Sequence, residues 1–197
     1  MAPDERRRAI VDAVVPLLLK HGDAVTTREI AEAAGIAEGT IFRVFPDKAA
    51  LLLATAEETM NPATGRADLG AALEGATTLR EKVLITTERL NARSERVMAV
   101  MIALRGAWMN QPEKGGHRHG PPQFILDANQ AVLEMLTEVF EDHRDELTVE
   151  PRTAALLLRT LAFGSRHPGV HSDERLTPKQ ITDALLDGIR RGPRTEG

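Results

Sequence analysis

The side chains best suited to chemistry in this sequence are cations and short polar groups gathered within residues 26–53. Phosphate groups are bound by helix N-termini and cations, whereas base edges are recognised by short polar or bidentate side chains. Arg28, Thr40 and Arg43 are side chains of these kinds, and Lys48 follows them along the chain. These are side-chain types that a contact with nucleic acid requires, and an ordinary solvated surface is the competing interpretation.

Two short helices joined by a tight turn are the elements that would position these side chains. Thr26 and Glu29 have the spacing of a capping box, in which each side chain binds a free backbone N–H at a helix start. The first helix stops at Gly35, because glycine favours the left-handed conformation at a helix end. The second helix begins at residue 38 or 39 and ends at Phe45. This pattern predicts a helix-turn-helix, whose second helix is shaped to enter a DNA major groove.

The segments TTREIAEAAGI, EGTIFRVF and PDKAALLL, with the helix before them, resemble the TetR/AcrR family of transcriptional regulators over residues 6–58. The run GIxxGTIFxxFPxKxxL is specific, whereas a two-helix apolar pattern alone is common. The resemblance implies that Thr27, Thr40 and Lys48 contact phosphates and that Arg43 reaches bases or backbone. The full set of residues for which it implies DNA binding is Thr27, Arg28, Gly39, Thr40, Phe42, Arg43, Val44 and Lys48.

Three positions depart from the usual pattern of the resembling family. Ala37 stands where a Ser or a similar helix cap is usual, which forgoes about 1 kcal/mol of capping. Phe42 stands where Tyr is usual and lacks a phosphate-contacting hydroxyl, and Val44 stands where a His or another polar residue is usual. These departures bear on the operator sequence and the affinity, and not on the fold. A solvated surface remains a full alternative for Arg28 and for the arginines at 6–8.

Composition and charge set the class of protein. The chain has 197 residues, of which 42% are hydrophobic and 27% charged, as in soluble globular proteins. It contains no cysteine, which excludes disulfides, thiol catalysis and sulfur-bound zinc and fits a reducing compartment. The formal net charge is −4, so DNA binding depends on where the cations lie. No uncharged apolar run approaches the ~18 residues of a membrane span, and we predict a cytoplasmic protein.

Helical apolar periodicity continues over the rest of the chain and predicts an all-α protein of about nine helices. Asn61, Pro62 and the small residues up to Gly75 are typical of a joint between domains. We predict a helix-turn-helix DNA-binding domain over residues 1–60 and a ligand-binding and dimerisation domain over residues 61–197. Besides the helix-turn-helix, the predicted helices span residues 4–21, 48–59, 78–91, 94–110, 123–142, 151–166 and 178–191.

The second domain of the resembling family binds a small molecule inside a helical pocket. Adaptable methionines and one amphipathic tryptophan suit a pocket for an apolar or amphipathic effector. Stripes of this kind also form ordinary core, which is the alternative for each residue. The residues that we predict to line the pocket are Met98, Met101, Leu104, Trp108, Phe124, Leu133 and Met135.

The resembling family forms homodimers in which the last two helices pair with their copies from a second subunit. The final predicted helix carries a single apolar stripe, and its small residues Ala184 and Gly188 permit a close approach. Closure of the monomer's own core is the alternative role for this stripe. The residues that we predict at the dimer interface are Leu158, Leu161, Ala162, Ile181, Ala184, Leu185 and Gly188.

The sequence gives no positive support for catalysis, nucleotide binding or metal binding. The three serines lie outside any nucleophile-elbow context, and no Gly-rich nucleotide fingerprint is present, so we predict that the chain is not an enzyme. His117 and His119, and likewise His167 and His171, have spacings that a metal could use. No carboxylate or cysteine cluster accompanies them. We therefore predict no cofactor and no metal site, with metal sensing as the alternative.

These features predict a homodimeric, ligand-responsive transcriptional repressor that binds a pseudo-palindromic DNA operator. Ligand in the second domain would change the distance between the two DNA-binding heads by binding one arrangement more tightly than the other. The competing hypothesis is a helical small-molecule-binding protein without specific operator binding. Ala37, Phe42 and the acidic balance of the chain are compatible with that hypothesis.

Overall fold

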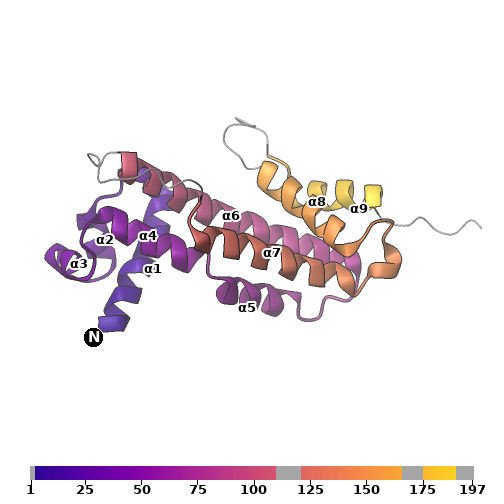
Figure 1. The fold of residues 1–197 in the computed structure, drawn as a ribbon, viewed down its shortest axis with the longest axis horizontal. Helices are drawn as coiled ribbons and strands as arrows, with labels where there is room; N and C mark the ends of the chain where they lie inside the picture. The colour runs from indigo at the N-terminus through magenta and orange to yellow at the C-terminus, as the bar shows by residue number, and fades with distance from the viewer. Residues whose placement is uncertain (1–2, 110–120, 166–174, 190–197) are drawn as a thin grey trace, which may run out of the picture. The chain divides into compact units, whose positions relative to one another are not determined.

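The computed structural model describes residues 3–109, 121–165 and 175–189, and the regular elements within them are helices (Figure 1). This part of the chain contains nine α-helices, which confirms the predicted all-α class. They are α1 (Pro3–His21), α2 (Thr27–Ala33), α3 (Glu38–Val44), α4 (Lys48–Thr59), α5 (Pro62–Leu73), α6 (Leu79–Met109), α7 (Gln123–Glu141), α8 (Pro151–Gly164) and α9 (Pro178–Ile189). Two short 3-10 helices, η1 (Gly22–Ala24) and η2 (Arg144–Glu146), complete the set.

The first four helices begin and end where local sequence signals place them. α1 continues through Pro16, and α2 begins directly after its cap Thr26. α4 begins after Asp47, whose side chain accepts a hydrogen bond from the N–H of Ala50 at 2.8 Å. A cap acts over three residues of sequence, so it is visible without knowledge of the fold.

Two expectations about the middle of the chain are wrong. Residues 61–75, expected as a joint, contain α5, because this segment has four alanines and its proline occupies the first helical position, where no N–H is needed. The separate helices expected at 78–91 and 94–110 form the single 31-residue helix α6. Ser94 does not begin a new helix: it lies inside α6, where its hydroxyl donates to the carbonyl oxygen of Leu90 at 2.7 Å.

The described residues belong to two compact units. The first unit comprises the described parts of residues 1–61 and 95–125, and the second those of residues 62–94 and 126–197. The core of the first unit includes Ile10, Val14, Ile30, Ile41, Phe45, Leu51, Leu52 and Leu104. The core of the second unit includes Val83, Leu90, Leu136, Phe140, Leu158, Ile181, Leu185 and Leu186, and a smaller cluster contains Leu69, Met135 and Val139.

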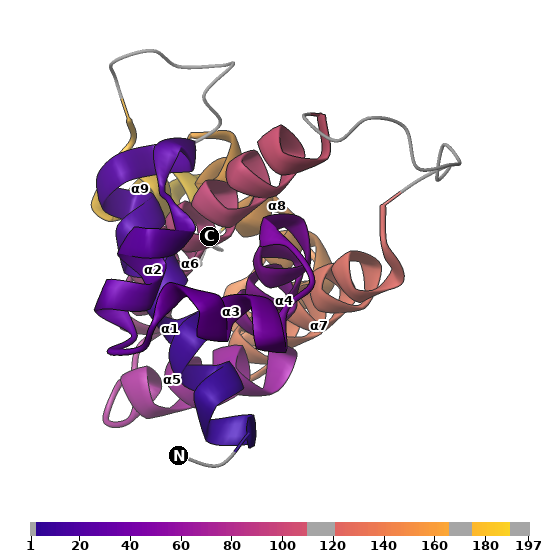
Figure 2. The ribbon, with the colours of Figure 1, turned by 90° about the vertical axis from the view of Figure 1, so that its left-hand side faces the viewer.

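Within the first unit, the short helices α2 and α3 are held on α1. α2 packs against both α1 and α3, and α4 packs along α1 (Figures 1 and 2). Ile30 and Ala31 are the buried residues of α2, and Ile41 is that of α3. A small number of apolar contacts thus fixes the position of α2 and α3. These contacts are necessary because isolated helices of this length are unstable in water.

Among the described residues, no helix combines the length and the apolar character that crossing a bilayer requires.

Candidate nucleic-acid interface

The start of α2 has the predicted capping box. The backbone N–H of Thr26 donates to a carboxylate oxygen of Glu29 at 2.8 Å, and the N–H of Glu29 donates to the hydroxyl of Thr26 at 3.2 Å. The N–H of Thr26 and its hydroxyl, which also donates to the Glu29 carboxylate at 2.8 Å, hold the pKa of that carboxyl below its ordinary value. At the other end, Gly35 adopts φ 67°, the left-handed conformation that glycine accepts without strain. α2 is therefore bounded by local interactions at both of its ends.

α3 is anchored through one side of its surface. Ile41 is fully buried, and Phe45, which follows the helix, is 2% exposed. The guanidinium of Arg7 in α1 lies over the ring of Phe45, with its carbon 4.7 Å from the ring centroid, a cation–π contact. Ala37 precedes the helix and makes no side-chain cap hydrogen bond, as the sequence predicts. The position of α3 thus depends on packing rather than on capping.

The remaining surface of α3 is open to solvent. Gly39, Phe42 and Arg43 are exposed, Phe42 with half of its surface accessible, while Thr40 and Val44 are half-buried. Among the described residues, Arg43 has no ion-pair or hydrogen-bonding partner. The five residues that sequence analysis places on this helix therefore form one continuous stretch with an unpaired cation beside an exposed aromatic ring.

The other three predicted DNA contacts have protein partners in this structure. The hydroxyl of Thr27 donates to a carboxylate oxygen of Glu38 at 2.6 Å, which links α2 to α3. Arg28 pairs with Glu32 one turn along α2, with a nitrogen–oxygen distance of 3.3 Å and both side chains exposed. An exposed pair of this kind holds its partners weakly, so Arg28 is readily available to another anion.

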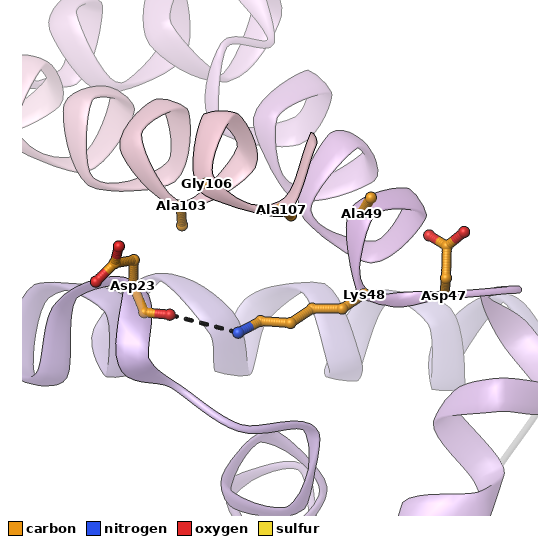
Figure 3. A pocket seen from close by; sticks show the side chains of 7 residues that line it. All are labelled: Asp23, Asp47, Lys48, Ala49, Ala103, Gly106 and Ala107. Atoms are coloured by element: carbon orange, nitrogen blue, oxygen red, sulfur yellow. Dashed lines mark hydrogen bonds between the residues drawn. The ribbon is translucent and has the colours of Figure 1, made fainter. Parts of the chain in front are cut away.

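Lys48 has the most internal position of the predicted contacts. Its ammonium donates to the backbone carbonyl oxygen of Val25 and, at 3.4 Å, to that of Asp23 (Figure 3). Asp23 lies in η1 and Val25 in the connection from η1 to α2. Lys48 therefore ties the start of α4 to the start of α2, a structural role that sequence analysis did not predict. Lys48 is 25 and 23 residues along the chain from its two acceptors, so no local pattern in the sequence could have indicated this role.

A pocket of about 330 Å³ adjoins Lys48 within the first unit (Figure 3). Small side chains of α6 form one wall, and a Cβ atom built on Gly106 would lie 3.7 Å from a carboxylate oxygen of Asp23. The residues that line the pocket are Asp23, Asp47, Lys48, Ala49, Ala103, Gly106 and Ala107. The short side chains keep space between the C-terminal part of α6 and the start of α4.

The residues predicted to bind a ligand do not gather in one cluster. Leu104 is buried in the core of the first unit, and Met101 and Phe124 pack against that core, while Met98 is half-buried. Leu133 belongs to the core of the second unit. Met135 lies in the smaller cluster and lines a pocket of about 400 Å³ between α5 and α7. The side chain of Trp108 lies outside what the structure describes.

Most of the residues predicted at a dimer interface are buried in the protomer itself. Leu158, Ala162, Ile181 and Leu185 lie in the core of the second unit, and Leu161 packs against it. Only Ala184 and Gly188 are exposed. The same helix pair exposes three large apolar side chains that the prediction omitted, Leu156, Leu157 and Phe163. The segment TAALLLRTLAFG is apolar on more than one side, which was the available signal.

No group of three or more potential metal ligands occurs among the described residues. The histidines at 117, 119, 167 and 171 lie outside the described residues.

Residues 10–55 match the sequence profile of the family described as bacterial regulatory proteins, tetR family. The chain is 39% identical to the HTH-type transcriptional repressor KstR of Mycolicibacterium smegmatis over 77 residues, which cover 39% of this chain and 37% of the relative. It is 49% identical to the HTH-type transcriptional regulator YvkB of Bacillus subtilis over 53 residues, which cover 26% of this chain and 27% of the relative. These matches span less than half the length of each relative.

Solved structures share the fold over nearly the whole chain. A TetR transcriptional regulator from Streptomyces coelicolor superposes with a TM-score of 0.63 at 20% identity and covers 95% of this chain and 99% of its own. The regulator FadR from Bacillus subtilis, in complex with stearoyl-CoA, superposes with a TM-score of 0.58 at 17% identity over 91% of this chain and 95% of its own. The family resemblance predicted from the sequence is confirmed.

Proposed function

We propose that this chain, whose residues 10–55 match the model of the tetR family, is a transcriptional repressor that binds operator DNA through α3. The observation that carries the proposal is the open surface of α3, where Arg43 and Phe42 project from a helix whose opposite side is buried. A rigid helix with a free cation can enter a major groove without first breaking an internal contact. The relatives KstR and YvkB are named as a repressor and a regulator, which supports the same class.

The proposed contacts divide by chemistry. Arg43 reaches bases or phosphates as a bidentate donor, Thr40 donates its hydroxyl to a phosphate, and Gly39 lets the backbone approach the DNA. Phe42 and Val44 offer apolar contacts, for which the methyl group of thymine is a suitable partner. Three further residues flank α3: Thr27, Arg28 and Lys48. Each adds a phosphate contact when a DNA phosphate replaces its present protein partner.

We further propose that the chain acts as a homodimer through α8 and α9. The exposed apolar side chains Leu156, Leu157 and Phe163 on α8 and the small exposed residues Ala184 and Gly188 on α9 support this role. Exposed large apolar residues that lie together mark interaction surfaces. A dimer places two copies of α3 on the two half-sites of a pseudo-palindromic operator.

Binding of an apolar or amphipathic effector completes the proposal. Such a ligand regulates DNA binding only by binding one arrangement of the helices more tightly than another. The pocket that Met98, Met101, Leu104, Trp108, Phe124, Leu133 and Met135 were predicted to line remains part of this proposal.

A titration of operator DNA tests the central claim. Duplexes selected from a random pool would be titrated at several salt concentrations with the wild type and with Arg43→Ala. Loss of one phosphate contact from a cation lowers the salt slope by about one, whereas loss of a base contact relaxes the selected sequence at that position. Arg89→Ala, which removes the same charge from an exposed position of the second unit, is the matched control and leaves the slope unchanged. Selection that enriches no sequence would favour the competing hypothesis of a binding protein without an operator.

Sedimentation of Gly188→Arg tests the dimer. A Cβ atom at Gly188 meets no atom within 4 Å in the protomer, so the arginine disturbs the fold little but places an unpaired charge in the proposed interface. Gly70→Arg, equally open in the protomer and located on α5, is the matched control. A folded Gly188→Arg variant that sediments as a dimer would refute the interface.

A further inference from the structure

Asn91, in the middle of α6, is buried without a hydrogen-bonding partner. Its side chain is 2% exposed, and no group among the described residues bonds to either its Oδ1 or its Nδ2 atom. Buried amides normally have partners, because an unpaired polar group loses its hydration without compensation. The described residues therefore do not supply what this amide requires.

Two buried hydroxyls lie on the same face of α6 as Asn91. Thr87 precedes it by four residues and Ser94 follows it by three, spacings that put side chains next to one another on a helix. The hydroxyl of Thr87 donates to the carbonyl oxygen of Val83, and that of Ser94 to the carbonyl oxygen of Leu90, both at 2.7 Å. Since their hydrogens are engaged, both hydroxyl oxygens are left as acceptors. Asn91 is thus the donor in a small buried polar surface.

This polar surface carries no charge. Every buried polar side chain among the described residues is neutral: Thr55, Thr86, Thr87, Asn91, Ser94, Ser165 and Thr182. Arg89 and Arg93 are the nearest cations along α6, and each lies about 200° around the helix from Asn91. Arg89 pairs with Asp68, and the guanidinium of Arg93 faces α5, where a Cβ atom built on Gly65 would lie 3.0 Å from its Cζ atom. A charged ligand group at Asn91 would be buried without a counter-ion, which strongly disfavours it.

We propose that Asn91 is the polar anchor of the effector site and that the effector is a neutral, apolar compound with a carboxamide or lactam group. The carbonyl of such a group accepts from Nδ2 of Asn91, and its N–H donates to Oδ1. A second N–H, where present, donates to the oxygen of Thr87 or Ser94. The proposal rests on the proposed function and deepens it by naming the chemical class of the effector. Because the amide is closed off, the ligand binds an opened arrangement of the helices and increases its population.

Isothermal titration of the full chain with decanamide and decanoate tests this proposal. The two probes share their alkyl chain, and at about pH 8 the carboxylate is fully ionised. The wild type should bind decanamide at least about tenfold more tightly than decanoate. Asn91→Leu, which keeps a similar volume and removes the amide, should bind decanamide at least about tenfold more weakly than the wild type. Asn91→Ala provides the same comparison if leucine disturbs the packing.

Thr182→Val is the matched control. Thr182 is another buried hydroxyl without a partner in the second unit. The next residue, Asp183, pairs with Arg80, which lies roughly 16 Å along the axis of α6 from Asn91. Thr182→Val should therefore bind decanamide as the wild type does. A wild type without a preference for decanamide overturns the proposal, as do Asn91→Leu and Asn91→Ala variants that bind decanamide with wild-type affinity.

Operator titrations of the same proteins separate this proposal from the proposed function. A wild type that prefers decanamide but selects no operator refutes the repressor and supports the polar anchor. A wild type that binds an operator but has no preference for decanamide refutes the polar anchor alone.

Discussion

Among the described residues, the two units differ in whether all of their buried hydroxyl and amide side chains have hydrogen-bonding partners. In the first unit, Thr55 is fully buried and its hydroxyl donates to the carbonyl oxygen of Leu51 at 2.9 Å. In the second unit, Thr86, Asn91 and Thr182 are buried with side-chain atoms that no described group bonds. Unpaired buried groups lower the stability of the arrangement that contains them. We interpret the first unit as built to keep one shape against DNA, and the second as built to rearrange around a ligand.

Truncation in the first core should have the largest effect. Ile41→Ala removes the buried side chain that anchors α3, and such changes lower the free energy of unfolding by about 2–5 kcal/mol. Urea unfolding measures this loss, and operator binding should disappear with it. Leu126→Ala, at an exposed position of α7, is the control and should stay within about 0.5 kcal/mol of the wild type. A small effect at Ile41 would mean that packing does not hold α3.

Lys48→Met should have the next largest effect. Methionine keeps the apolar stem and removes the ammonium that bonds to the carbonyls of Val25 and Asp23, hydrogen bonds of a kind that contributes about 1.5–3 kcal/mol. Each kcal/mol corresponds to roughly 2–4 °C in melting temperature for a chain of this size. Arg43→Met should weaken DNA binding without lowering the melting temperature. Equal melting temperatures for both variants would contradict the structural role of Lys48.

The same substitution in the two units should change stability in opposite directions. Thr55→Val removes a hydroxyl that has a partner and should lower the free energy of unfolding by about 0.5–1.5 kcal/mol. Thr182→Val removes a buried hydroxyl without one and should raise it by up to about 1 kcal/mol. Chemical unfolding of both variants provides the measurement. Changes of the same sign would remove the distinction between the units.

The capping box should give the smallest effect, and it should depend on pH. The hydrogen bonds from Thr26 lower the pKa of Glu29 in the folded state, so its contribution to stability is present above the ordinary value of 4.5 and is lost as pH falls through the folded pKa. Glu29→Gln keeps an acceptor for the N–H of Thr26 but cannot ionise. The wild type should be the more stable protein near neutral pH, and the two unfolding curves should converge in acid. A difference that persists unchanged in acid would place its origin elsewhere.

The sequence by itself determined the elements that depend on neighbouring residues. The capping box at Thr26, the left-handed turn at Gly35 and the cap at Asp47 each act over a few residues, and the structure contains all three. The family motif over residues 26–53 rests on the same local signals. The sequence also predicted which side of α3 is exposed, because one buried position on a short helix fixes the orientation of that helix.

Only the tertiary structure decided which partners distant residues find. No local pattern predicts that Lys48 bonds to the carbonyls of residues 23 and 25, or that Ser94 continues α6 instead of beginning a new helix. From the sequence, the apolar stripe on α9 could face either the core of its own protomer or a second subunit, because both arrangements bury the same apolar surface. In the structure, most of the stripe is buried in the core of the second unit. Asn91 shows most clearly that burial is decided by the tertiary structure. Its burial depends on elements far away in sequence, and a helix surface pattern treats it as an ordinary polar residue.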